Sequence, residues 1–188
     1  MDAKFIYKWL GVFGLGICCI SLIELTFFIL LNSIIDMNIE SQLYTIGVVV
    51  FTSGFMPPHS ILIGTVIFSS IVIYIVLGAI LYLVSRRKSL ENMVLAKFVL
   101  LIGLFLIIGG FFKLTFIVFL GKTTITSGAI SITFQEAIYD ALITPLFGAI
   151  IWMYLIGVIC SLLISGLIFG AVGLKWILKL QENSSNNK

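Results

Sequence analysis

Residues Ile61–Val84 read ILIGTVIFSSIVIYIVLGAILYLV and contain no charged side chain. A helix needs roughly 20 apolar residues to cross the hydrocarbon core of a bilayer, so this stretch is long enough to cross once. The whole chain of 188 residues is 61% hydrophobic and 10% charged, whereas a soluble domain is about 45–50% apolar and about 25% charged. So few charges cannot cover a soluble surface, and disorder would need low hydrophobicity with high charge. The sequence therefore predicts an integral membrane protein.

Three further apolar stretches have the same character, and two of them contain a charge well away from their ends, Glu24 and Lys113. The first stretch is too long for the apolar region of a signal peptide and ends in no small-residue cleavage site, so we expect an uncleaved span. The expected fold class is an all-α membrane protein, a four-transmembrane-helix bundle with a small β-sheet or hairpin formed by the two outer loops. A single membrane domain covers 1–180, with spans at 7–31, 61–84, 94–120 and 146–174, outer loops at 32–60 and 121–145, and a polar tail at 181–188.

The positions of the basic residues set the expected orientation. Lys and Arg prefer the cytoplasmic side of a membrane protein, and four spans place Lys4, Arg86–Lys88 and Lys175 on one side. The apolar stretch Leu43–Met56 is too short for a span, and a fifth span would place Arg86–Lys88 outside. We therefore expect a multi-pass protein of the plasma (cytoplasmic) membrane with both termini in the cytoplasm. The expected membrane-surface anchors are Arg86, Arg87, Lys88, Trp9 and Trp176.

Both outer loops show β-strand signals. Residues Tyr44–Thr52 are rich in β-branched side chains, and Thr123–Phe134 contains two β-rich runs separated by Ser127 and Gly128. Glycine supplies the positive φ that a tight hairpin turn requires. We expect one small sheet built from both loops, the alternative being irregular loops at the membrane surface. A short helix is expected at Gln135–Leu142, and Pro145 is expected to begin the last span.

The layout resembles that of claudin-type tetraspans, which also have four spans and a strand-bearing first outer loop. The resemblance concerns architecture alone, because residues 33–60 contain neither the Trp nor the paired Cys of that family's first loop. A resemblance between folds does not transfer function. No family is assigned on this basis.

Glu24 and Lys113 are the charges that fall deep inside the predicted spans, away from the span ends. Their positions put both charges outward of the span centres at similar depth, within about one helical turn. An unpaired charge in hydrocarbon costs at least ~2.5–3.5 kcal/mol on insertion scales. We therefore predict an intramembrane ion pair that ties the first span to the third. Two alternatives stay open: Glu24 serves a proton or ion relay, or Lys113 extends to the membrane surface while Glu24 is protonated or bonded to a hydroxyl.

Small residues recur along the last span. Small residues at every fourth position let two helices approach closely in lipid. We expect one face of this helix to pack inside the chain and the adjacent face to contact a partner subunit, the alternative being that both faces are internal. The two sets are Gly157, Ser161 and Ser165 on one face and Gly166 and Gly170 on the other.

The cysteines and the single histidine form no recognisable metal or redox motif. Cys18, Cys19 and Cys160 fall near the middle of their spans and could meet there, but the chain has no C-x-x-C. His59 stands alone outside the spans, so we expect packing residues rather than a metal centre. The chain also lacks a phosphate-binding loop, a nucleophile elbow and a zinc-protease motif. No catalytic residue and no metal site are therefore expected.

These features favour a non-catalytic accessory subunit that packs against and stabilises larger partners in a respiratory, energy-converting or transport complex. The expected partners are membrane lipids and other integral membrane subunits, in a hetero- or homo-oligomer, and no nucleic acid. Two alternatives stay open: a small oligomeric ion or solute carrier or channel that uses Glu24, and a membrane redox or quinone-linked enzyme. No cofactor is predicted, although a bound lipid or quinone stays open.

Overall fold

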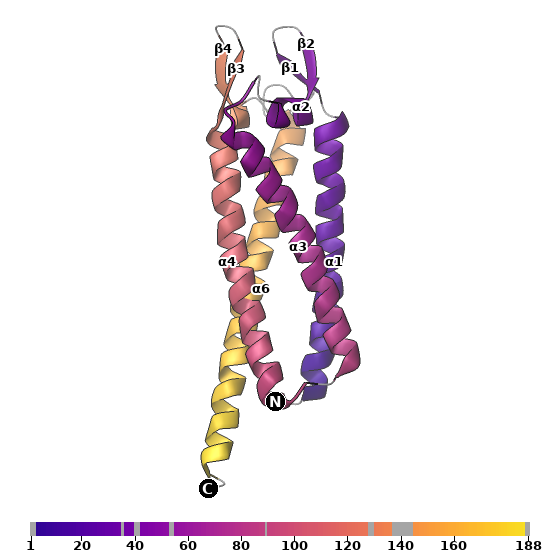
Figure 1. Cartoon of the computed structure of the whole chain (residues 1–188), viewed down its shortest axis with the longest axis vertical. Helices are drawn as coiled ribbons and strands as arrows, with labels where there is room; N and C mark the ends of the chain where they lie inside the picture. Colours follow the sequence, from indigo (N-terminus) through magenta and orange to yellow (C-terminus); the bar gives the residue numbers. More distant parts are fainter. Residues whose placement is uncertain are drawn as a thin grey trace. The chain divides into compact units, whose positions relative to one another are not determined.

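Long apolar helices make up most of the computed structural model, which describes residues 3–34, 36–39, 42–52, 55–88, 90–127, 130–136 and 145–186. Within these ranges, four helices are long and apolar enough to cross a membrane. They are α1 (Ala3–Ile34), α3 (His59–Arg87), α4 (Asn92–Lys122) and α6 (Pro145–Asn186), as Figure 1 shows. The chain is therefore a multi-pass membrane protein, which confirms the predicted fold class.

Each long helix continues beyond the apolar stretch that predicts it. The difference is largest in α6, which continues to Asn186 through residues that we expected to form a separate polar tail. Extending an existing helix adds one hydrogen bond for each residue fixed, so polar helix formers such as Gln181 and Glu182 continue it at little cost. Pro145 is the first residue of α6, as predicted, because its missing N–H leaves no helical hydrogen bond unmade there.

A hairpin follows α1 (Figure 1). Its strands β1 (Asp36–Ile39) and β2 (Gln42–Thr45) pair antiparallel, with Met37 opposite Tyr44. The sequence indicates strand structure only from Tyr44 onward. The sequence does not predict the strand β1, because two of its four residues, Asp36 and Asn38, are of types that are depleted in strands. Pairing with β2 therefore decides its conformation.

The short helix α2 (Ile46–Phe51) replaces most of the predicted strand Tyr44–Thr52, which is correct only as far as Thr45. The hydroxyl of Thr45 caps this helix by accepting a hydrogen bond from the backbone N–H of Val48 at 3.3 Å. The buried residues of α2 are Ile46, Val49 and Val50. Their spacing of i, i+3 and i+4 is that of one helix face, and burial of this face outweighs the strand propensity of β-branched residues.

A second hairpin follows α4, as predicted. Its strands are β3 (Thr124–Ser127) and β4 (Ile130–Thr133). The prediction of one sheet from both loops is wrong, because among the described residues each loop forms its own two-stranded sheet. The backbone N–H of Thr126 instead donates a hydrogen bond to the carbonyl of Phe55 at 3.0 Å. The two loops therefore meet through an irregular segment rather than through a shared strand.

The chain divides into two compact units. Unit 1 comprises Met1–Cys19, Ile75–Phe112 and Val158–Lys188, and unit 2 comprises Ile20–Tyr74 and Lys113–Gly157. Each unit therefore contains part of every long helix. Both hairpins and α2 belong to unit 2, where they lie at one end of its helices (Figure 1).

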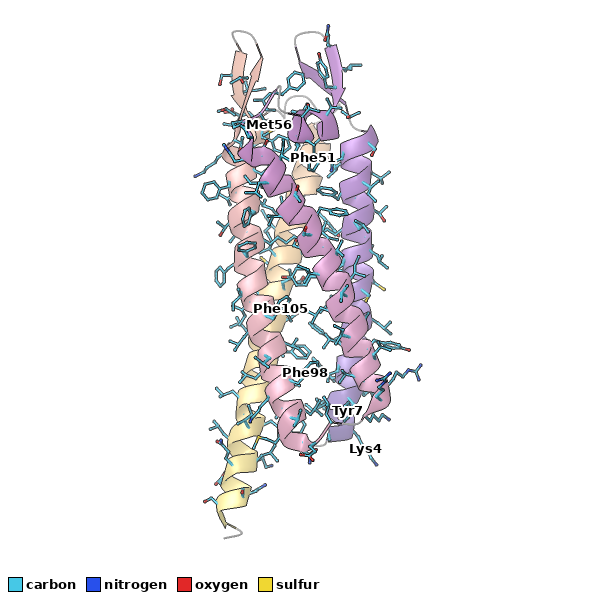
Figure 2. The ribbon with its side chains drawn as sticks, in the orientation of Figure 1. Lys4, Tyr7, Phe51, Met56, Phe98 and Phe105 are labelled. Atoms are coloured by element: carbon cyan, nitrogen blue, oxygen red, sulfur yellow. The ribbon has the colours of Figure 1, made fainter. Side chains whose placement is uncertain are left out.

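In unit 1, Tyr7 ties α1 to the segment that precedes α4 (Figure 2). Its hydroxyl donates a hydrogen bond to the carbonyl of Leu90 and accepts one from the N–H of Leu90, both at 3.0 Å. The side chain of Tyr7 is 4% exposed. Large aliphatic residues fill the rest of this interior, and those that are fully buried include Leu10, Leu81, Leu95, Val99 and Leu106.

In unit 2, loop residues form an apolar cluster at the ends of the helices, which we name the loop cap. Its buried members come from α2, from the segment after α2, from β3 and from the residue after β4. They are Ile46, Val49, Val50, Met56, Ile125 and Phe134. Figure 2 labels Met56 and its neighbour Phe51, which packs against the cluster. The loops are therefore an integral part of the hydrophobic core of unit 2.

Candidate functional site

A buried ion pair joins α1 to α4 inside unit 2. The ammonium group Nζ of Lys113 donates a hydrogen bond to Oε1 of Glu24, and the two residues are 2% and 4% exposed. The same ammonium group lies 5.8 Å from the centroid of the Tyr74 ring on α3, within the range of a cation–π contact. The structure thus brings together the two charges that the sequence places inside the spans. Each charge compensates the other in surroundings where an unpaired charge would be costly.

An apolar cavity of about 110 Å³ lies beside Glu24 in unit 2. All four long helices and the loop cap contribute to its walls, which are mostly hydrocarbon. The polar side chains along it are those of Glu24, Asn32 and Tyr154. Asn32 is already bonded, because its amide donates a hydrogen bond to the carbonyl of Phe28 at 2.6 Å. A cavity of this kind suits a small apolar molecule with few polar groups.

Tyr154 on α6 is one of the residues that line this cavity. Its hydroxyl is buried and has no hydrogen-bond partner among the described residues. Its ring stacks on Phe27 of α1, with centroids 5.3 Å apart and an angle of 17° between the planes. Sequence reasoning missed Tyr154, although a phenol inside a predicted apolar span is a signal, because a buried Tyr hydroxyl usually needs a partner.

The small residues of α6 have different surroundings in the structure. In unit 1, Gly166 and Gly170 pack against Gly103 of α4, where an added Cβ on Gly103 would lie 2.3 Å from the backbone N of Gly170. These two glycines therefore serve packing within the chain. In unit 2, a Cβ added to Gly157 would meet nothing within 4 Å. The other two small residues, Ser161 and Ser165, are partly buried in unit 1.

A second close helix contact in unit 1 was missed by sequence reasoning. An added Cβ on Gly14 of α1 would lie 2.7 Å from the carbonyl oxygen of Gly78 on α3. Next to it, the thiol of Cys18 donates to the carbonyl of Ile75 at 3.3 Å. The signal was present, because Gly14 and Cys18 are small residues four positions apart, the spacing that favours close approach in lipid.

The expected surface anchors differ in exposure. Arg86, Arg87 and Lys88 are exposed at the end of α3, and Nε of Arg86 donates to the hydroxyl of Tyr82 at 3.1 Å. Two tryptophans were also expected at the surface. Trp9 is 48% exposed, whereas Trp176 is only 3% exposed. The expectation for Trp176 is therefore corrected: its ring is a packing element of unit 1, because neighbouring side chains cover it.

Outside the four long helices, Thr133 and Glu136 form a reciprocal cap on the short helical segment 134–136. The Glu136 carboxylate accepts hydrogen bonds from the backbone N–H of Thr133 at 2.9 Å and from its hydroxyl at 2.8 Å. The Thr133 hydroxyl accepts one from the N–H of Glu136 at 3.2 Å, which completes a capping box. Both hydrogen bonds hold the pKa of Glu136 below its usual value. The bond from the Thr133 backbone has the larger effect, and the bond from the Thr133 hydroxyl has the smaller one. The rest of the predicted helix Gln135–Leu142 lies outside the described residues.

The cysteines and His59 show no shared site. Cys18, Cys19 and Cys160 are free thiols, and the last two are exposed. His59 is the first residue of α3 and is exposed. Over the described part of the chain, no three His, Cys, Asp or Glu residues lie close enough together to hold a metal ion. The described polar groups that come together inside the spans are instead those around Glu24 and Lys113.

Comparisons with known proteins add no information about the function of this site. No protein-family model, no curated protein and no solved structure matches the chain. Function is therefore inferred from the chain's own residues.

Proposed function

We propose that the chain is an accessory subunit without catalytic activity of its own, which packs against and stabilises larger subunits of a membrane complex. The observation that supports this most directly is the ion pair of Glu24 and Lys113. Each charge is compensated by the other, so the pair is suited to holding α1 against α4 rather than to binding a charged substrate. Other arrangements of these helices would leave a buried charge uncompensated, and the pair thereby favours one packing.

An exposed face of α6 in unit 2 is the surface that we propose for the partner subunit. Met153 and Ile156 are 64% and 53% exposed, and Gly157 is exposed with open space around it. Their spacing of i, i+3 and i+4 puts them on one side of the helix. A glycine beside two large apolar residues lets a second transmembrane helix approach closely. The proposed host is a respiratory, energy-converting or transport complex.

We further propose the plasma membrane as the location, with both termini in the cytoplasm. Arg86, Arg87 and Lys88 are exposed at the end of α3, and clusters of this kind favour the cytoplasmic side. There they would contact anionic lipid head groups. A C-terminal fusion to alkaline phosphatase, which is active only outside the cytoplasm, is expected to be inactive. An active fusion would contradict the orientation.

Affinity purification of the tagged chain in a mild detergent tests the subunit proposal. Larger membrane proteins are expected to co-purify in a fixed ratio, and Gly157→Leu is expected to release them. Gly16→Leu on α1 is a matched control, because an added Cβ on Gly16 also meets nothing within 4 Å. A chain that migrates alone and sustains an activity at full rate would contradict the proposal.

One observation favours a second candidate, a small oligomeric ion or solute carrier or channel. Glu24 lines the cavity, so a proton or ion that enters this space meets a carboxylate. In reconstituted vesicles this candidate predicts a flux that disappears in Glu24→Gln while the variant still assembles. The accessory-subunit proposal predicts no flux from either protein.

A further inference from the structure

We propose that a groove in unit 1 holds one acyl chain of an anionic phospholipid, and that Lys175 and Lys179 on α6 bind the phosphate of its head group. The groove has a volume of about 100 Å³ and is formed by side chains of α1, α4 and α6. It belongs to unit 1, whereas the cavity beside Glu24 belongs to unit 2, and the two share no residue. This lipid site is independent of the proposed subunit role.

The groove is apolar and accessible from one side. Its walls are aliphatic and aromatic side chains. Leu10 and Val99 are fully buried and Phe169 is 5% exposed, whereas Trp9 and Ile168 are 48% and 46% exposed. The exposed side chains belong to membrane-spanning helices, so they face lipid. A hydrocarbon chain can therefore enter the groove from the bilayer and remove these walls from contact with nothing but other chains.

Aromatic contacts at the groove set the level of α1 against α6. The ring of Phe169 lies 6.4 Å from that of Trp9 and 4.4 Å from that of Phe13, measured between centroids. Within unit 1, α1 begins and α6 ends at the same end (Figure 1). Ala3 precedes Trp9 by six residues, and Lys175 follows Phe169 by six. At equal helical rise, Lys175 therefore lies level with the start of α1.

Lys175 and Lys179 continue the side of α6 that forms the groove. Counted from Ile168, Val172 is at i+4 and the two lysines are at i+7 and i+11. These spacings return to the same side of a helix. The helical rise puts the lysines about 4.5 and 10.5 Å beyond Val172, and both are exposed. A chain that lies in the groove thus has its head group beside two ammonium groups.

The charges at this end of the groove favour an anionic head group. Neither Lys175 nor Lys179 has a carboxylate partner among the described residues. The first-turn N–H groups of α1 lie at the same level and add partial positive charge. Among the residues that the structure describes, the acidic ones in unit 1 are Glu91 and Glu182. A zwitterionic head group carries a cation of its own, which the lysines repel, whereas an anionic phospholipid carries none that opposes them.

Quenching of Trp9 by brominated lipids tests the proposal, because bromine on an acyl chain quenches a tryptophan that the chain touches. The full chain is placed in phosphatidylcholine vesicles with rising fractions of brominated phosphatidylglycerol or brominated phosphatidylcholine. The signal from Trp9 is the difference between the natural chain and Trp9→Phe. The natural chain is expected to prefer phosphatidylglycerol by about 5- to 30-fold, the range for one or two lysine contacts with an anionic surface.

Neutralising the two lysines together, with Lys175→Gln and Lys179→Gln, is expected to abolish this preference. Arg87→Gln with Lys97→Gln is the matched control, because it removes two charges from exposed residues of unit 1 that do not line the groove. The control should keep the preference. An equal preference in the lysine variant and the natural chain would overturn the proposal. Equal quenching by both lipids in the natural chain would also overturn it, and so would a lack of Trp9 quenching, which would indicate a protein partner over the groove.

A second variant tests the position of the acyl chain. Ile168→Phe adds volume at an exposed wall of the groove, so it should reduce the quenching of Trp9 by brominated phosphatidylglycerol. Leu167→Phe is the control, because Leu167 is 62% exposed and does not line the groove. Equal quenching in these two variants would place the chain elsewhere and contradict the proposal.

Discussion

Lys113 and Glu24 stand 89 residues apart in the chain, and the structure joins them by a hydrogen bond from Nζ to Oε1. Both residues lie in membrane-spanning helices and both are buried. A charge that is costly to insert alone becomes half of a compensated pair once α1 meets α4. The pair therefore makes the contact between these helices specific within unit 2.

Removing one partner should harm the protein more than removing both. Glu24→Leu leaves the Lys113 ammonium buried and unpaired, so the free energy of unfolding should fall by about 3–5 kcal/mol. Adding Lys113→Met should restore most of this loss, because apolar replacements of a buried ion pair are often neutral. Unfolding of the purified variants in detergent measures these differences. A double variant no more stable than the weaker single variant would argue against a mutual ion pair.

The glycine contact between α4 and α6 should tolerate no added methyl group. In Gly103→Ala the new Cβ would lie 2.3 Å from the backbone N of Gly170, and backbone cannot move aside as a flexible side chain can. We expect unit 1 to be destabilised by about 1–3 kcal/mol, the usual cost of overpacking. Gly16→Ala is the control, with a change within about 0.5 kcal/mol, because its Cβ meets nothing. Equal melting temperatures for the two variants would refute the close contact.

The capping box at Glu136 should show in a carboxyl titration. Thr133→Val removes one of two hydrogen bonds to the carboxylate, so the pKa of Glu136 should rise toward its usual value while remaining below it. The hydrogen bond from the Thr133 backbone persists and accounts for the remaining shift. Carbon-13 NMR of the labelled protein measures the titration, with Thr126→Val as the control on the neighbouring strand. An unchanged pKa in Thr133→Val would rule out the hydroxyl contribution.

The same pKa shift predicts the direction of a pH effect. Folding lowers the pKa of Glu136, so the unfolded chain binds a proton more readily than the native one in this range. The cap therefore contributes stability above the unfolded pKa of about 4.3, and this contribution disappears as the pH falls through the lowered native pKa. Glu136→Gln should remove this part of the pH dependence, which acid unfolding of the two proteins compares.

The cap of α2 offers a test of the loop conformation. Thr45→Ala removes the hydroxyl that accepts from the N–H of Val48, and the expected cost is about 0.5–2 kcal/mol. Thr45→Ser keeps a capping hydroxyl and should retain most of the stability. Hydrogen exchange at the Val48 amide reports the effect locally. If both variants exchange alike, the segment does not depend on this cap.

The site residues that could be predicted from the sequence are those whose residue type is rare inside a membrane span. Glu24 and Lys113 are charges deep inside apolar spans, so their depth and their pairing were predicted from residue type and helical rise. Gly103 and Gly78 looked like ordinary membrane glycines, and only the helix opposite each one shows why a side chain cannot fit. Trp176 was expected at the surface because of its place along the span, but its burial depends on neighbours from other helices.

The sequence by itself determined that the chain is a membrane protein with four spans, because the length and apolarity of a helix-forming run are local properties read against a fixed bilayer thickness. It also determined the hairpin after α4 and the start of α6 at Pro145, where local turn and helix chemistry suffice. Only the tertiary structure decided that Ile46–Phe51 is a helix, that the described strands of each loop form a separate sheet, and that a cavity lined by Tyr154 lies beside Glu24. These features depend on contacts between residues far apart in the chain, and no local pattern specifies which surfaces will meet.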